Sequence, residues 1–294
     1  MPDSNITKSP LPGLYIVATP IGNLGDITPR AAATLALADI IAAEDTRVTA
    51  KLLSHLGLRK HMLPYHDHSD ERTRSSLIDR MANEIVVLVS DAGTPLISDP
   101  GYKLVRDARA AGRHITTLPG PCAAIAAITL SGLPSDRFLF AGFLPNKAKA
   151  RSDMIAEFSA LRATLVFYES GPRLSASLAA LAAGLGNREA AVAREISKIY
   201  EQCVTGTLQD LSARYADLPP KGEIVVIVAP PDDDQHEQGD DAAIDAALVE
   251  ALAAHNVAKA AKAVAKRFGL DRHQVYARAL AIKALTPMSG DEAG

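Results

Sequence analysis

The sequence predicts an α/β protein built from two α/β domains and a small C-terminal helical module. Three observations lead to this prediction. Short apolar runs alternate with alanine-rich or amphipathic stretches up to about residue 229, a proline-bounded acidic segment follows, and the remainder is alanine-rich without strand-like runs. Strands that alternate with helices favour a largely parallel sheet covered by helices on both faces.

The first domain, residues 13–132, is predicted from apolar runs separated by helical stretches. The expected strands are Leu14–Ala18, Asp39–Ala43, Ile85–Val89 and His114–Leu118, and the expected helices lie near Pro29–Ala38, Asp70–Asn83 and Pro100–Ala111. Residues 1–12 are polar and contain prolines, so we expect a disordered N-terminus without a signal peptide.

The second domain, residues 133–229, begins at the short Leu133–Ser135 junction. Its expected strands are Phe138–Phe143, Thr164–Tyr168, Ala190–Arg194 and Glu223–Ala229, and its expected helices are Ala148–Leu161, Pro172–Leu185 and Leu208–Tyr215. Residues 230–241 form an acidic linker, because two prolines end the last strand and the acidic run has no apolar surface to bury.

The C-terminal module, residues 242–287, is predicted to resemble a helix-turn-helix, and residues 288–294 form a tail. Its helices are Val257–Phe268 and Arg272–Ala284, with Asp271 as the N-cap of the second. A strongly basic segment is typical of phosphate binding, although an ordinary solvated helix surface is the alternative. The candidate RNA-binding residues are Lys259, Lys262, Lys266, Arg267, Arg272, Arg278 and Lys283.

Composition narrows the class of protein further. The two cysteines, Cys122 and Cys203, are too few and too far apart for a disulfide framework or a thiolate metal site, which fits a reducing cytosol. No apolar run approaches the length of a membrane span, so we expect a cytoplasmic protein without a membrane partner. The net charge of −3 argues against a chain that coats nucleic acid over its whole surface.

Three loops that follow expected strands are candidates for ligand binding. They are Ala18–Asp26, Ser90–Tyr102 and Pro119–Ala123, all rich in glycine or proline. An open α/β sheet binds its ligand at the carboxyl ends of its strands, so the three loops together predict a pocket. The first loop lacks the Gly-Lys-Ser/Thr ending of a P-loop and the Gly-x-Gly-x-x-Gly spacing of a dinucleotide site, and taken alone it could be only a tight turn.

These loops, in their order and spacing, resemble those of the methyltransferases named for tetrapyrrole (precorrin) methylation. More narrowly, the chain is similar to the branch of that class that modifies small-subunit ribosomal RNA. The resemblance runs from about Gly13 to Ala229 and continues into the C-terminal helices. The stretches that carry it are Leu14–Ala31, Ala43–Thr49, Ser90–Tyr102, Gly132–Pro145, Phe167–Arg173, Ala193–Glu201 and Lys221–Val228.

The resemblance implies a two-domain enzyme, usually a homodimer, that binds S-adenosyl-L-methionine between its domains. The implied substrate is 16S ribosomal RNA or the small ribosomal subunit, methylated on the 2′-oxygen of a cytidine. The implied cofactor contacts are Pro20, Asp91, Ala92, Gly93, Pro95, Ile97, Pro121, Cys122, Ala123, Tyr168, Glu169, Gly222 and Glu223. Tetrapyrrole methylases commonly have Gly-Asp-Pro where this chain has Gly93-Thr94-Pro95, which leaves the role of Thr94 open.

Methylation of a hydroxyl needs alignment and a group that takes or polarises its proton. The catalytic candidates are Glu44, Asp45, Arg47, Glu169, Arg194, Glu195 and Lys198. For Asp45–Arg47 and Arg194–Glu195, structural ion pairs at strand ends are the alternative reading. A lysine of lowered pKa or a carboxylate suits proton transfer, and an arginine suits a phosphate. Asp26 is expected to cap the helix that follows it. His66-Asp67-His68 is a weak metal motif, and no metal is predicted.

Two other functions remain open at this point. A tetrapyrrole-type small-molecule methyltransferase would share the cofactor fold but has no need of a basic C-terminal module. A non-catalytic nucleic-acid-binding protein would use the helix-turn-helix alone and leaves the three glycine-rich loops unexplained.

Overall fold

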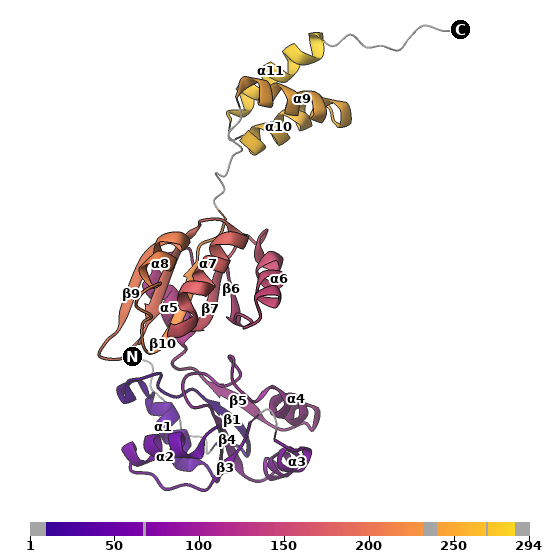
Figure 1. Ribbon diagram of the computed structural model, residues 1–294. Helices are drawn as coiled ribbons and strands as arrows, with labels where there is room; N and C mark the ends of the chain where they lie inside the picture. The colour runs from indigo at the N-terminus through magenta and orange to yellow at the C-terminus, as the bar shows by residue number, and fades with distance from the viewer. Residues whose placement is uncertain (1–9, 67–68, 232–239, 269, 286–294) are drawn as a thin grey trace, which may run out of the picture. The chain divides into compact units, whose positions relative to one another are not determined.

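The computed structural model describes residues 10–66, 69–231, 240–268 and 270–285. The chain divides into two compact units, Met1–Pro230 and Pro231–Gly294 (Figure 1). Most of the predicted N-terminal segment and acidic linker, and the predicted tail, lie outside the described residues, as do Asp67 and His68. Within the described part of the chain, no helix combines the length and the apolar character of a membrane span.

The first sheet is fully parallel, as the alternation of strands and helices predicts. Its strand order is β3-β2-β4-β1-β5. The strands are β1 (Gly13–Val17), β2 (Ile40–Ala43), β3 (Met62–Pro64), β4 (Ile85–Val89) and β5 (Ile115–Leu118). β1 and β2 are buried along their whole length, and β4 from its second residue on, which explains their continuous apolar runs.

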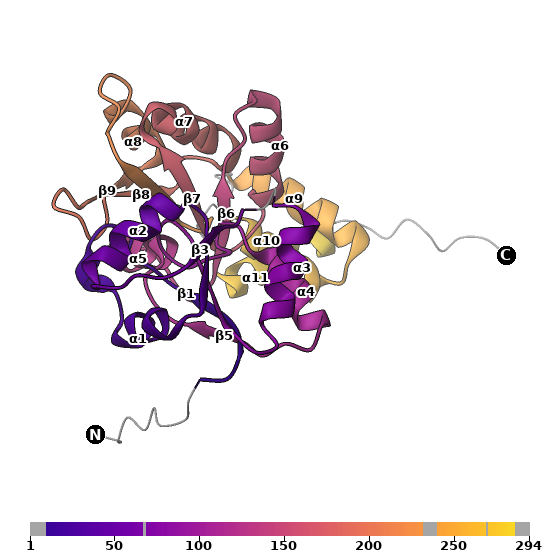
Figure 2. The same cartoon turned by 90° about the horizontal axis from the view of Figure 1, so that it is seen from below.

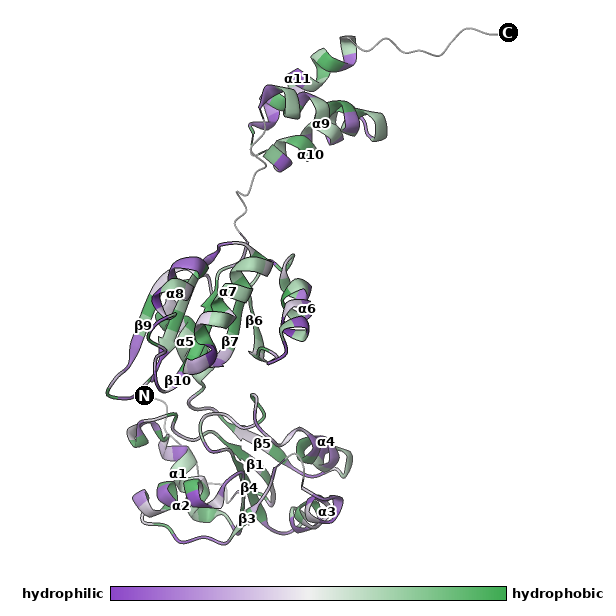
Figure 3. Ribbon diagram, in the orientation of Figure 1, coloured by the Kyte–Doolittle hydropathy of each residue, from purple (hydrophilic) through white to green (hydrophobic). Residues whose placement is uncertain are grey.

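Four helices cover the two faces of this sheet in pairs (Figure 2). They are α1 (Pro29–Leu37), α2 (Thr46–His55), α3 (Glu71–Arg80) and α4 (Tyr102–Ala110). Leu35 of α1 and Leu52 of α2 pack on one face, whereas Leu77 of α3 and Leu104 of α4 pack on the other. Figure 3 shows the hydrophobic colour concentrated in the strands and much of the hydrophilic colour on α3 and α4.

The second sheet is mixed and mostly antiparallel, in the order β6-β7-β10-β8-β9. Only β6 and β7 run parallel, so the parallel arrangement of the first sheet does not extend to the second. The strands are β6 (Phe138–Phe143), β7 (Thr164–Ser170), β8 (Glu189–Arg194), β9 (Gln202–Thr207) and β10 (Glu223–Val228).

Helices also lie on both faces of the second sheet. The elements are α5 (Ala123–Ser131), α6 (Ala148–Phe158), the short 3-10 helix η2 (Gly171–Arg173), α7 (Leu174–Leu185) and α8 (Leu208–Arg214). α6, α7 and α8 cover one face, and α5 packs on the other through Ala127 and Ile128. α5 precedes Leu133–Ser135 in the sequence, yet its partners are strands of the second sheet.

The second unit contains α9 (Asp241–Ala254), α10 (Val257–Phe268) and α11 (Arg272–Leu285). They share an apolar core that includes Leu248, Val264 and Val275. The Asp271 carboxylate accepts hydrogen bonds from the backbone N–H groups of His273 and Gln274, which confirms it as the N-cap of α11. Within the described part of this unit, all regular secondary structure is helical, as predicted.

The predicted capping role of Asp26 is wrong. Thr28 caps α1 by accepting a hydrogen bond from the N–H of Ala31, and Asp26 ends the short 3-10 helix η1 (Leu24–Asp26). The Asp26 carboxylate instead accepts a hydrogen bond from the Ser197 hydroxyl. Thr28 sits immediately before Pro29, the first helical residue, and so occupies the capping position itself.

Candidate active site

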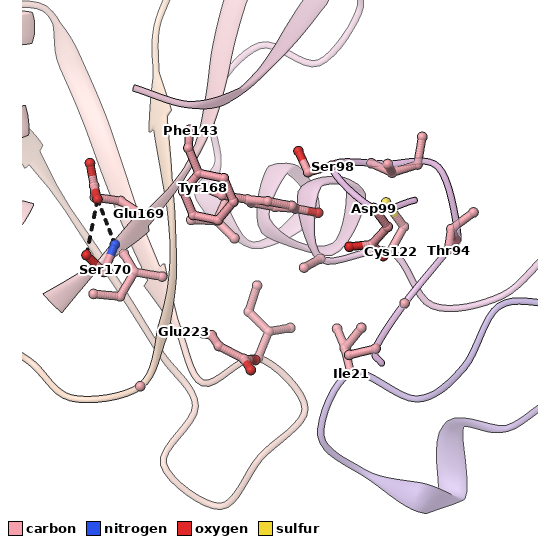
Figure 4. A pocket seen from close by; sticks show the side chains of 18 residues that line it. Ile21, Thr94, Ser98, Asp99, Cys122, Phe143, Tyr168, Glu169, Ser170 and Glu223 are labelled. Carbon is pink, nitrogen blue, oxygen red and sulfur yellow. Dashed lines mark hydrogen bonds between the residues drawn. The ribbon is translucent and has the colours of Figure 1, made fainter. Parts of the chain in front are cut away.

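A cavity of about 380 Å³ lies in the first unit where the loops after β1 and β4 meet strands of the second sheet (Figure 4). Pockets of this size hold small-molecule ligands and cofactors. Its lining is Ile21, Ala92, Gly93, Thr94, Ile97, Ser98, Asp99, Cys122, Ala123, Phe143, Tyr168, Glu169, Ser170, Ile196, Gly222, Glu223, Ile224 and Val225. Lysine and arginine are absent from this lining.

Aromatic rings form part of the cavity wall. The Tyr168 ring packs edge-to-face against Phe140 and Phe143, with centroid distances of 4.8 and 5.7 Å. Burial raises the pKa of the Tyr168 hydroxyl to about 12. Because it stays protonated at neutral pH, Tyr168 offers a fixed hydrogen-bond donor beside an apolar surface.

Asp99 is a half-buried carboxyl group in the same cavity. Burial raises its pKa to about 6, a hydrogen bond from Ser90 opposes this rise, and the nearby carboxylates of Glu44 and Asp91 add to it. Figure 4 shows Asp99 beside Cys122, on the side of the cavity toward which the Tyr168 hydroxyl points. At neutral pH the group is mostly ionised and supplies negative charge to the cavity.

A second hollow, of about 390 Å³, adjoins the first. The two share three lining residues, Ile21, Ala92 and Glu223. The rest of the second lining is Thr19, Pro20, Gly22, Leu24, Val48, Thr49, Lys51, Leu52, Ser90, Asp91 and Lys198. The shared wall means that a ligand in one hollow lies next to a ligand in the other.

The ends of β2 and β4 are joined by reciprocal hydrogen bonds. The backbone N–H of Asp45 donates to the Asp91 carboxylate over 3.0 Å, and the N–H of Asp91 donates to the Glu44 carboxylate over 3.2 Å. Burial raises the pKa of Asp91, and the Asp45 charge adds to the rise. Hydrogen bonds from Arg47 lower the pKa of Asp45 to about 2, with an Nη2–Oδ2 distance of 2.6 Å.

Lys198 lies between two carboxylates. Its ammonium is 3.0 Å from Glu195 Oε1 and 3.0 Å from Glu223 Oε2. Partial burial alone would lower the pKa of Lys198, but these two hydrogen bonds outweigh it and raise the pKa. The same interaction lowers the pKa of Glu195. Both groups are therefore charged at neutral pH, which does not favour Lys198 as a proton acceptor.

Glu169 faces away from the cavity, and its place in the lining does not come from its carboxylate (Figure 4). The residue is only 4% exposed. Its carboxylate accepts hydrogen bonds from Ser177 and from the N–H of Ser170 and lies 3.4 Å from Arg173. Arg194 is also engaged elsewhere, since its Nε donates to the Gln202 side chain over 2.9 Å. The Glu169 contacts thus hold its side chain outside the cavity, and the Arg194 contact is a neutral hydrogen bond rather than an ion pair with Glu195.

The predicted cofactor contacts divide into three groups. Ala92, Gly93, Ile97, Cys122, Ala123, Tyr168, Glu169, Gly222 and Glu223 line the first cavity. Pro20 and Asp91 line the second hollow. Pro95 and Pro121 line neither, although the carbonyl of Pro121 accepts a hydrogen bond from the Thr94 hydroxyl over 2.9 Å. This bond ties two of the predicted loops together and gives Thr94 a positioning role.

The sequence-based candidates omit several lining residues. Among them are Ser98, Asp99 and Phe143, which lie inside stretches that carry the family resemblance. The Ser90–Tyr102 loop contains both Asp91 and Asp99, and only the fold shows that Asp99 enters the cavity. An acidic residue of the cavity lining therefore lay within a recognised motif.

Among the residues that the structure describes, the non-glycine residues with positive φ lie in two loops beside the cavity. Leu96 (φ 74°) and Ser98 (φ 62°) lie in the loop after β4, and Glu195 (φ 50°) and Ser197 (φ 66°) lie in the loop after β8. Such backbone conformations are sparsely populated and cluster at functional sites.

Among the described residues of the second unit, the basic side chains are not equivalent. Lys259, Lys262, Arg267, Arg272 and Lys283 are exposed. Arg278 instead pairs with Asp241 and Asp245 of α9, with 2.5 Å contacts to each. The side chain of Lys266 lies outside the described residues. Arg278 thus holds α11 against α9, a contact that the charge pattern of α10 and α11 alone did not predict.

Over the residues that the structure describes, no group of three His, Cys, Asp or Glu side chains is arranged to hold a metal ion. The backbone N–H of His66 donates to the Ser69 hydroxyl over 2.9 Å, and its two predicted companions lie outside the described residues.

Family models and curated relatives match almost the whole length of the chain. The family model "Tetrapyrrole (Corrin/Porphyrin) Methylases" matches residues 13–212, and "RsmI C-terminal HTH domain" matches residues 238–283. The ribosomal RNA small subunit methyltransferase I of Erythrobacter litoralis is 56% identical, over 92% of this chain and 96% of its own. The protein of that name from Mesorhizobium japonicum is 47% identical, over 95% and 96%.

A solved structure shows the same fold at low sequence identity. It is the uroporphyrin-III C-methyltransferase of Thermus thermophilus complexed with S-adenyl homocysteine. Its TM-score is 0.51 at 19% identity, with 74% of this chain and 97% of that chain covered. On the two family models and the two close relatives, the chain belongs to the ribosomal RNA small subunit methyltransferase I family, within the tetrapyrrole methylases.

Proposed function

We propose that this chain transfers a methyl group from S-adenosyl-L-methionine to small-subunit ribosomal RNA, at the 2′-oxygen of a cytidine. The observation that carries the proposal is the pair of adjoining hollows with a common wall of Ile21, Ala92 and Glu223. A methyl transferase needs donor and acceptor side by side, and the names of the close relatives specify ribosomal RNA as their acceptor.

The first cavity fits this cofactor. Its apolar and aromatic wall suits an adenosyl group, and the Tyr168 hydroxyl provides a donor for a polar edge. Asp99 is a carboxylate among lining residues that include no lysine or arginine within the described chain, which favours a cationic ligand. Bound there, S-adenosylmethionine would supply an electrophilic methyl group on a positively charged sulfur.

The second hollow is the proposed place of the acceptor ribose. Its wall combines loop residues such as Pro20 and Gly22 with the charged side chains of Lys51, Asp91 and Lys198. Confining the hydroxyl next to the donor converts an encounter between two molecules into an aligned displacement, and effective molarities of ~10⁵ M or more measure that advantage.

Asp91 is the proposed acceptor of the hydroxyl proton. It lines the second hollow, and burial raises its pKa, so it is a better base than Asp45 or Glu195, whose pKa values are lowered. The N–H of Asp45 fixes its carboxylate. Lys198 stays protonated between Glu195 and Glu223, and its positive charge suits the oxygen or a neighbouring phosphate.

The helical second unit is proposed to contact the RNA. Between Asp241 and Leu285 it contains seven basic and four acidic residues. Double-stranded RNA is recognised mainly through shape and phosphates, so exposed cations such as Lys259 and Lys262 suffice without base-specific side chains.

The direct test is methyl transfer from labelled S-adenosylmethionine to small ribosomal subunits that lack the modification, followed by nucleoside analysis. The proposal expects label in 2′-O-methylcytidine. Label in a base, or in another nucleoside, would overturn the assignment of the acceptor atom. Cofactor binding without transfer to subunits or to naked RNA would overturn RNA as the substrate.

A further inference from the structure

The first sheet carries a basic surface that begins at the second hollow and runs along α2. From Thr46 to His66 the chain contains four Lys or Arg residues and no Asp or Glu, although the whole chain has a net charge of −3. The residues of this basic surface are Arg47, Lys51, His55, Arg59 and Lys60. The proposed methyl transfer gives no role to His55, Arg59 or Lys60.

The spacing of these residues places them on one face. Arg47, Lys51 and His55 follow one another at intervals of four, so their side chains lie along one side of α2. All three are exposed, while Leu52 and Leu53 of the same helix are buried against the sheet. The surface is thus the solvent side of an amphipathic helix.

Two parts of the basic surface lie beside hollows. Lys51 lines the second hollow, beside Asp91 and Lys198. Arg59 and Lys60 line a third hollow of about 520 Å³, together with α2 residues such as Leu53. The basic surface is therefore continuous with the proposed acceptor site and leads away from it.

The balance of acidic and basic residues differs between α2 and the helices on the opposite face of the sheet. On α3 and α4 acidic residues lie among the cations, and Arg74 and Arg106 both pair with Asp107. On α2 only Arg47 pairs with a carboxylate, that of Asp45. Lys51 and Arg59 form no ion pair with any described carboxylate, and the Lys60 ammonium donates to the carbonyl of Ala38 over 3.0 Å.

We propose that the basic surface on α2 binds the phosphates of the RNA strand that flanks the methylated nucleotide, in addition to the contacts of the C-terminal helices. The inference rests on the proposed function for the identity of the strand. A row of exposed cations that ends in the acceptor hollow matches a polyanion whose one nucleotide enters that hollow.

The test compares two double variants of the full chain that remove the same charge from opposite faces of the sheet. The α2 variant, Lys51→Gln/Arg59→Gln, removes two positive charges from the basic surface. The matched control, Arg72→Gln/Arg109→Gln, removes two positive charges at exposed positions of α3 and α4. Binding of unmodified 16S ribosomal RNA is measured between 50 and 200 mM salt, together with the KM for small subunits.

The α2 variant is expected to lower the slope of log K against log salt by about 0.7 to 0.9 per lost contact and to raise KM on the order of tenfold. The control variant is expected to match the wild type, and the charge-keeping Lys51→Arg/Arg59→Lys is expected to keep the wild-type salt slope. Equal changes of salt slope and KM in the α2 and control variants, or no change in either, would overturn the proposal that the basic surface binds RNA. A change of oligomeric state in the α2 variant alone would overturn it in favour of an interface between copies.

Two readouts separate this inference from the proposed function. S-adenosylmethionine affinity, measured by calorimetry, is expected to be the same in all variants. If the wild type binds RNA but methylates none, the proposed function fails. The salt slopes still show whether the basic surface binds RNA phosphates. If methylation proceeds and the α2 variant has the same salt slope as the wild type, only the proposal that the basic surface binds RNA is overturned.

Discussion

The hydroxyl of Ser197 donates a hydrogen bond to the Asp26 carboxylate, although the two residues are 171 positions apart. The bond joins the loop after β1 to the loop after β8. Next to it, Gly22 packs so closely on Lys198 that a Cβ atom at position 22 would lie 2.4 Å from Lys198 Cγ. Two loops from different sheets thus meet over the second hollow.

Breaking this bond is expected to loosen the acceptor site rather than the fold. Asp26→Ala and Ser197→Ala should each raise KM for the subunit a few-fold and leave S-adenosylmethionine affinity unchanged. A double-mutant cycle on kcat/KM should give a coupling of about 0.5–1 kcal/mol, because both variants remove one exposed hydrogen bond. Additive effects would show that the loops act independently.

Lys198 is expected to act as a fixed cation. Because its pKa is raised by Glu195 and Glu223, the rate should not increase with a lysine ionisation between pH 8 and 9.5. Lys198→Arg should keep activity within about fivefold, whereas Lys198→Met should lose more, since it leaves two carboxylates facing each other. The contrary outcome has two parts: the arginine variant is as inactive as the methionine variant, and the rise of the rate at alkaline pH disappears. Together they would identify Lys198 as the base.

Asp99 is expected to make cofactor binding depend on pH. As the pH falls through about 6, the carboxylate becomes neutral and loses its attraction for the sulfonium cation, so the Kd for S-adenosylmethionine should rise. Asp99→Asn should flatten this dependence. S-adenosylhomocysteine, which lacks the sulfonium charge, is the control ligand, and calorimetry from pH 5 to 8 measures both. Parallel curves for the two ligands would exclude a charge effect.

Arg278 and the exposed lysines of α10 are expected to behave differently. Arg278→Ala removes the contacts with Asp241 and Asp245 and should lower the thermal stability of the second unit, with little change in the salt slope of RNA binding. Lys259→Ala/Lys262→Ala should do the opposite, with a slope reduced by about 0.7 to 0.9 for each phosphate contact. The same slope change in both variants would contradict a structural role for Arg278.

The sequence predicted the first sheet well because β1, β2 and β4 are buried on both faces and so read as continuous apolar runs. It missed β3, whose three residues end in proline, and β9, whose Gln-Cys-Val-Thr-Gly-Thr run is polar. Both are edge strands, which bury less side-chain surface and carry a weaker pattern.

At the site, the sequence located the loops better than the individual groups. Ala92, Gly93 and Cys122 could be placed because a motif fixes a whole loop. Glu169 could not, since its orientation depends on β7, where Leu165 and Phe167 share its face and Tyr168 takes the other. Asp26 was assigned to a local cap, but its partner comes from a distant loop.

The left-handed backbone at Leu96, Ser98, Glu195 and Ser197 has an evolutionary consequence. Each such residue costs of the order of 1 kcal/mol or more, and glycine would relieve that cost. Glycine would also give the unfolded chain more conformational freedom, so a glycine substitution exchanges strain in the folded loops for a larger entropy loss on folding. Thermostable relatives of this chain should differ from it in packing and surface charge while they preserve these four backbone conformations.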